Sequence, residues 1–141
     1  LEHIFAAGAF MIARPTLDQR KIIATLNDEA RARIGIDTII WHTHGFLQLS
    51  DEDQAAVRAC MISYDAWNIG NSSDGDRDFG AIFQHSDGTW TPYTPDGEGW
   101  LNLVFWEISY HDLSLSRPSM MPWDDASTAR ILMLMLASEY D

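Results

Sequence analysis

Residues 101–110 have the sequence LNLVFWEISY, and this stretch decides the fold. Side chains along a β-strand alternate between the two faces of the sheet. One alternating set is apolar throughout except for Asn102, whereas the other begins apolar and turns polar at Glu107 and Ser109. A strand with apolar residues on both faces belongs in the interior of a sheet. The stretch therefore predicts a central strand.

Two further stretches upstream are also predicted to be extended. Phe79 to Gln84 is rich in residues that favour strands, and turn-forming Asp, Gly and Pro residues separate it from residues 101–110. These two strands predict a β-hairpin with a long, acidic and aromatic connection. Ile36 to His44 is rich in β-branched residues and predicts another strand.

Three helices are predicted around these strands. Thr16 and Gln19 form a capping box before a helix over 17–33. Ser50 and the acids that follow it mark the start of a second helix. The run Ile131–Leu136 is hydrophobic on every side and predicts a last helix, which must be covered on most sides or pair with a second copy. A homodimer is therefore one possible assembly.

The predicted order α-β-α-β-β-α favours an α+β fold. We expect a single α+β domain over residues 11–141, with helices packed on a small, at least partly antiparallel sheet. The 141 residues suffice for one hydrophobic core. We expect residues 1–10 to be an expression-derived or disordered segment, because the apolar run that starts at Ile4 lacks the basic flank of a signal peptide.

The second half of the chain is strongly acidic. Residues 71–141 contain twelve Asp and Glu against three Arg and no Lys, and the whole chain has a formal net charge of −12. Such a surface repels nucleic acids and anionic membranes, so neither is an expected partner. It favours a basic protein partner. The single cysteine, Cys60, cannot form an internal disulfide, which favours a cytoplasmic location.

Several short motifs carry a resemblance to a known family. They are Leu26-Asn27-Asp28, Asp78-Phe79-Gly80, the strand Phe105–Asp112 and the stretch Thr128–Tyr140. In this order they resemble a family of small bacterial proteins known as domain of unknown function 3768, over about residues 20–140. The resemblance implies a protein of bacterial origin, often on plasmids and other mobile elements, and it implies no activity.

The chain differs from that family in two places. The corresponding strand motif of the family contains Lys and Asp residues, whereas this chain has Glu107, Ser109 and His111. A role built on that Lys and Asp does not transfer to this chain. The connection from Gln84 to Gly99 also looks longer here, so a function located in it would be specific to this protein.

Candidate binding residues gather in the loops of the acidic half. Aromatic and acidic side chains on turn-rich loops are typical of protein interfaces, although the aromatics could instead cover the sheet. The candidates are Asp74, Asp76, Asp78, Trp90, Tyr93, Asp96, Glu98 and Trp100. With them we predict a non-catalytic interaction protein, for example an inhibitor whose acids mimic the charge of nucleic acid.

The alternative is a small metal-dependent enzyme. His42 and His44 would lie about 7 Å apart on one side of a strand. His111 with Asp112, or alternatively His85, could complete a metal site. Asp74 to Asp78 resembles the start of a calcium loop, but Phe79 replaces the required glycine. The chain has no nucleophile elbow and no phosphate-binding glycine loop, so the sequence favours a protein without catalysis or cofactor.

Overall fold

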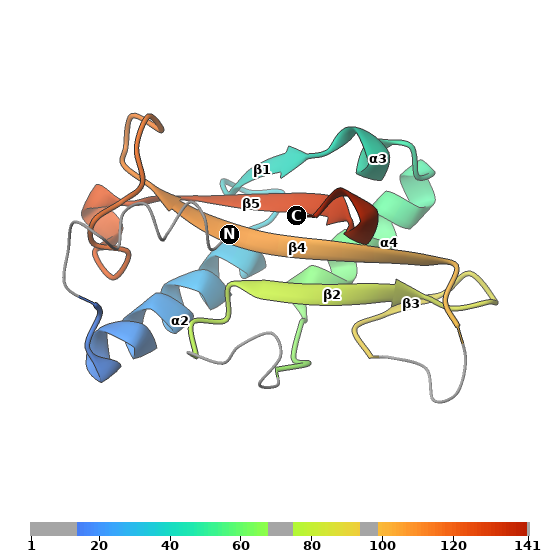
Figure 1. Cartoon of the computed structure of the whole chain (residues 1–141), viewed down its shortest axis with the longest axis horizontal. Helices are drawn as coiled ribbons and strands as arrows, with labels where there is room; N and C mark the ends of the chain where they lie inside the picture. Colours follow the sequence, from blue (N-terminus) through green and yellow to red (C-terminus); the bar gives the residue numbers. More distant parts are fainter. Residues whose placement is uncertain (1–13, 68–74, 94–98, 141) are drawn as a thin grey trace.

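A computed structural model describes residues 14–67, 75–93 and 99–140 (Figure 1). Its elements are α2 (Leu17–Ala32), β1 (Ile39–His42), α3 (His44–Leu47), α4 (Asp51–Ile62), β2 (Phe79–Gln84), β3 (Trp90–Thr91), β4 (Asn102–His111), η1 (Asp125–Ser127), β5 (Ala129–Leu136) and η2 (Ala137–Glu139). The predicted α+β class is confirmed. Of the predicted residues, Asp74, Asp96, Glu98 and the segment 1–10 lie outside the described ranges.

The strands form one mixed sheet in the order β1-β5-β4-β2-β3. The predicted central strand, residues 101–110, is β4, which pairs antiparallel with β2 on one side and with β5 on the other. The predicted hairpin partner, Phe79–Gln84, has the predicted bounds. The long connection contributes β3, a two-residue edge strand paired to β2.

The predicted last helix is wrong, because Ile131–Leu136 belongs to strand β5. This strand lies between β4 and β1, antiparallel to β4 and parallel to β1. An apolar run with no polar face suits a strand buried on both sides of a sheet as well as it suits a buried helix. Ile131, Leu132 and Leu134 are almost fully buried within this chain. Most of the run is thus covered within this chain.

The two long helices begin as predicted. The Thr16 hydroxyl accepts from the Gln19 backbone and the Gln19 side chain accepts from the Thr16 backbone, which completes the capping box of α2. The Ser50 hydroxyl accepts from the Asp53 backbone at the start of α4. Figure 1 shows both helices behind the sheet.

The helices and the sheet enclose the core. Ile23 of α2, Val57 and Met61 of α4, and Trp106 of β4 have no exposed surface. Gly80 of β2 faces Trp106 closely, since a Cβ on Gly80 would lie 2.5 Å from the indole nitrogen. On the opposite face of the sheet the rings of Phe79, Phe105 and Tyr140 contact one another.

Candidate functional site

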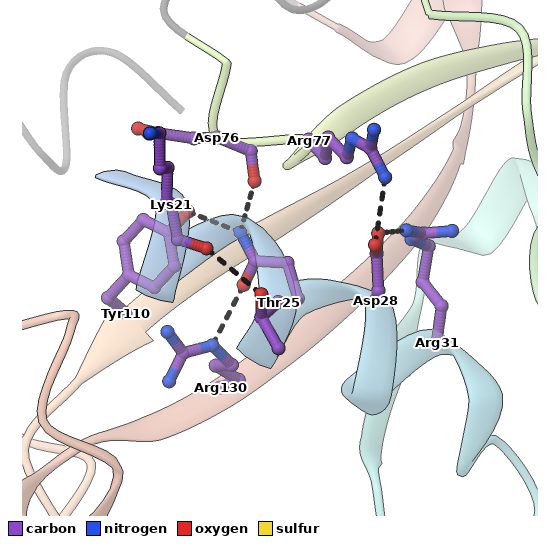
Figure 2. Close-up of polar contacts among 9 residues, drawn as sticks. Lys21, Thr25, Asp28, Arg31, Asp76, Arg77, Tyr110 and Arg130 are labelled. Carbon is purple, nitrogen blue, oxygen red and sulfur yellow. Dashed lines mark hydrogen bonds and ion pairs between the residues drawn. The ribbon is translucent and has the colours of Figure 1, made fainter. Parts of the chain in front are cut away.

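A buried polar cluster joins α2 to the sheet around Asn27, which has no exposed surface. Its amide nitrogen donates to the Asp76 carbonyl and to the Tyr110 hydroxyl, both at 2.8 Å. Its amide oxygen accepts from Nε of Arg130 at 2.8 Å. Figure 2 shows how Tyr110 and Arg130 approach from the strands and Asp76 from the loop before β2. One side chain therefore connects three parts of the chain.

Tyr110 extends the cluster to a carboxylate. Its hydroxyl donates to Oδ2 of Asp78 at 3.0 Å while accepting from Asn27. Burial raises the pKa of Tyr110 well above its usual value, and the nearby charge of Asp78 adds to this effect. Tyr110 therefore stays neutral and remains a hydrogen-bond donor at physiological pH.

The loop before β2 alternates its side chains between the interior and the surface. Asp76 is 2% exposed, and Nη1 of Arg20 lies 3.3 Å from its carboxylate. Arg77 has a φ of +58°, in the left-handed region that non-glycine residues seldom adopt. Its exposed guanidinium donates to Asp28 at 2.9 Å. Asp78 points back to Tyr110. We refer to Asn27, Asp76, Asp78, Tyr110 and Arg130 as the Asn27 cluster.

Arg31 of α2 lies beside this cluster between two indole rings. Its guanidinium carbon is 4.8 Å from the centre of the Trp67 ring and 5.4 Å from that of Trp106. Asp28 accepts from both Arg31 and Arg77. Burial lowers the pKa of Arg31, and the charge of Asp28 opposes that shift. Cation–π contacts and one carboxylate thus hold a buried arginine.

A second group of acidic and aromatic residues lies around α4 and β3, with Asp51 and Glu52 at the start of α4 and Asp65 just beyond its end. Asp51, Glu52, Asp65, Asp87 and Tyr93 are all exposed there. Tyr93 is 55% exposed and donates to Oδ1 of Asp65 at 2.5 Å. We refer to these five residues as the acidic edge.

The other two aromatic candidates differ in their environments. Trp90 is 8% exposed, and its indole nitrogen donates to Asp53 at 3.0 Å, so it belongs to the core. Trp100 is 45% exposed and its ring contacts Phe83 at 5.2 Å. The structure thus places Asp76, Asp78 and Trp90 in interior contacts, and leaves Tyr93 and Trp100 at the surface.

Comparison with known proteins gives one match, which is a family model. The model described as "Protein of unknown function (DUF3768)" matches residues 42–139. The chain belongs to the DUF3768 family. No curated protein and no solved structure matches the chain.

The motifs that carry the DUF3768 resemblance meet in the Asn27 cluster. Tyr110 comes from the strand motif, Asp78 from Asp78-Phe79-Gly80, and Arg130 from the stretch Thr128–Tyr140. Asn27 lies before the residues that the family model matches. The sequence patterns did not identify Asn27 or Arg130 as site residues. Asn27 follows the core residue Ile23 by four positions, which places both on the same face of α2. A polar residue on this apolar face was the one sequence signal for a buried polar contact.

The predicted three-histidine metal site does not form in this DUF3768 domain. His42 stacks on Phe46 and accepts from Nη2 of Arg58 at 3.2 Å. The ring of His111 lies beside Trp41. Because Trp41 and His42 are neighbours in one strand, their side chains point to opposite faces of the sheet. His42 and His111 are therefore on opposite faces.

His44 does not share a strand face with His42 either, because the strand ends at His42 and Thr43 caps the short helix α3. Within residues 14–67, 75–93 and 99–140, no group of three His, Cys, Asp or Glu side chains could hold a metal ion. Over the same ranges, no helix is both long and apolar enough to cross a membrane.

Proposed function

We propose that this DUF3768 protein is a non-catalytic interaction protein whose acidic edge binds a basic surface of another protein. The observation that carries the proposal is the exposure of four carboxylates around α4 and β3, those of Asp51, Glu52, Asp65 and Asp87. Helix α4 contains one cation, Arg58, and its guanidinium donates to His42 and Gln54. It therefore does little to neutralise the carboxylates at the start of the helix.

Exposed aromatic rings supply the second requirement of an interface. Tyr and Trp are common anchors because they bury a large area with few rotatable bonds. Tyr93 stands within the acidic edge, where Asp65 holds its hydroxyl. Trp100 is exposed at the β3 end of the sheet, where it packs on Phe83 of β2. Charge would steer a basic partner toward this end, and the rings would retain it.

One concrete form of this function is inhibition of a nucleic-acid-binding protein by charge mimicry, in which carboxylates take the place of phosphates. A cytoplasmic location accords with Cys60. Its thiol is half-buried, donates to the Trp90 carbonyl and has a pKa raised by burial, all of which are features of a structural thiol.

The test is an NMR titration of the labelled protein with a synthetic Lys- and Arg-rich peptide. We expect amide shifts concentrated on the acidic edge, and affinity that falls steeply with salt. Neutralising the edge with Asp51→Asn and Glu52→Gln should weaken binding by about tenfold at low salt.

The matched control is the pair Asp18→Asn and Glu29→Gln in α2, which removes the same charge from exposed helix positions. Asp18 also occupies the first turn of its helix, as Asp51 does in α4. Equal loss of binding in the two double variants, or shifts spread evenly over every exposed carboxylate, would contradict the proposal.

A further inference from the structure

A groove of about 350 Å³ runs between α2, from Leu17 to Asp28, and the loop before β2. Its lining residues are Leu17, Arg20, Lys21, Ala24, Thr25, Asp28, Gly75 and Arg77. Ala24 and Gly75 leave room between the longer side chains. The groove is separate from the acidic edge.

The charge of this groove is opposite to that of the chain. Three of its lining residues are cations, Arg20, Lys21 and Arg77, and one is a carboxylate, Asp28. Arg20 pairs with Asp76 and Asp28 pairs with Arg31, so with these partners included four cations face two carboxylates. Asp28 already accepts from the buried Arg31 as well as from Arg77. Across the described ranges, Lys21 has no carboxylate within ion-pair distance, since the ion pairs found there involve arginines. A chain of net charge −12 thus presents a local excess of positive charge.

The backbone of Arg77 is held in an unfavourable conformation at the wall of this groove. Its φ of +58° lies in the left-handed region, which is strained for a residue with a side chain. That conformation allows Asp76 to be buried against Asn27 while the Arg77 guanidinium stays on the outside. Residues held in such conformations are concentrated at ligand-binding sites.

We propose that this groove binds the phosphate group of a small molecule. Cations from α2 on one side and from Arg77 on the other can approach a tetrahedral anion from two directions. Guanidinium groups bind phosphate oxygens with paired hydrogen bonds, and an ammonium group adds a mobile charge. The excess of two positive charges among these paired groups and Lys21 matches a phosphate dianion better than a single carboxylate. Leu17 and Ala24 offer apolar contact to an attached organic group.

The experiment follows the amide signals of Lys21, Thr25, Asp28 and Gly75 by NMR during titration with sodium phosphate, at an ionic strength kept constant with chloride. We expect saturable shifts with a Kd on the order of 1 mM. A parallel titration with glycerol 3-phosphate distinguishes an organic phosphate ester from free inorganic phosphate as the source of the bound phosphate group. Tighter binding of the ester indicates an organic phosphate, and equal binding indicates the free ion.

Two variants test the assignment to the groove. Lys21→Gln removes one cation at an exposed position. Arg77→Gly removes another together with its pair to Asp28, and relieves the positive φ. Each should weaken phosphate binding by at least about fivefold. Arg33→Gln is the control, since Arg33 caps the C-terminal end of the same helix outside the groove and pairs with Asp37.

Three results would overturn the proposal. The first is an absence of saturable shifts in the wild type, and the second is an equal loss of binding in the Arg33→Gln control. The third is tighter binding of a short DNA duplex at the same amides, because that would assign the groove to nucleic acid.

Discussion

The Asn27 cluster and the acidic edge contain the same kinds of residue, carboxylates beside aromatic rings. These residues make interior contacts in the cluster and face solvent at the edge. In the cluster, Asp76 and Asp78 accept from buried or half-buried donors, and the Tyr110 ring is 3% exposed. At the edge, Asp65 and Tyr93 face solvent. The difference teaches that an acidic and aromatic composition does not identify a binding surface by itself. The donors that each carboxylate meets in the fold decide between a structural and a binding role.

The largest expected effect comes from removing the centre of the cluster. Asn27→Ala should lower the free energy of unfolding by about 3 kcal/mol, because it removes three buried hydrogen bonds, those to Tyr110, Arg130 and the Asp76 carbonyl. Urea denaturation measures the change. Asn102→Ala is the control, with a loss of about 1 kcal/mol, since the half-buried Asn102 side chain donates to Gln84 alone among the described residues. Equal losses would contradict the central role of Asn27.

The next effect concerns the packing beside the cluster. Gly80→Ala should cost about 2 kcal/mol, because the added Cβ would lie 2.5 Å from the Trp106 indole nitrogen and 2.6 Å from Cζ of Tyr64. Thermal unfolding should report a lower Tm. At Gly99, by contrast, an added Cβ meets nothing within 4 Å, so Gly99→Ala should leave Tm nearly unchanged. A wild-type Tm for Gly80→Ala would show that this contact can relax.

A smaller effect separates the two tryptophans near the acidic edge. Trp90→Phe should cost about 1 kcal/mol, since it removes the indole donor to Asp53 from a nearly buried site. Trp100→Phe should leave the free energy of unfolding unchanged and weaken binding of the basic peptide instead. Guanidinium denaturation and the peptide titration together check this pair. Destabilisation by Trp100→Phe as large as that of Trp90→Phe would place both rings in the core.

The smallest effect is a change in how stability depends on pH, and it is seen only under alkaline conditions. The pKa of Tyr110 is raised in the folded state, so the unfolded chain loses this proton at lower pH than the folded chain. The contribution to stability is therefore fully present below about pH 10 and is lost as the pH rises above it. Tyr110→Phe should reduce the fall in urea midpoint between about pH 9 and pH 11. Tyr93→Phe, at an exposed position, should retain most of that fall.

Local signals in the sequence were sufficient for most of the fold. The capping box at Thr16, the Ser50 cap and the alternation in residues 101–110 depend on neighbouring residues, and each predicted its element. The run Ile131–Leu136 failed because a wholly apolar stretch has no polar face to reveal its period. Its partners, β1 and β4, are distant in sequence, and pairing with them made it a strand.

The candidate sites were less predictable for a related reason. The sequence identified Asp76 and Asp78 as acids in a turn, but their partners Arg20 and Tyr110 lie far along the chain. Tyr93 was predicted from a local signal, an aromatic residue on an acidic loop, and the structure leaves it exposed. The positive groove was missed because its cations are divided between α2 and the loop before β2, within a chain whose overall charge is negative.

The position of β5 has a consequence for how the chain acquires its fold during synthesis. Among the described strands it is made last, yet it occupies an inner position and is the strand that joins β1 to the rest of the sheet. While the ribosome is still translating the preceding loop, β1 and one edge of β4 have no strand to pair with. Exposed strand edges attract other chains, so the nascent protein is vulnerable to aggregation until β5 emerges and inserts.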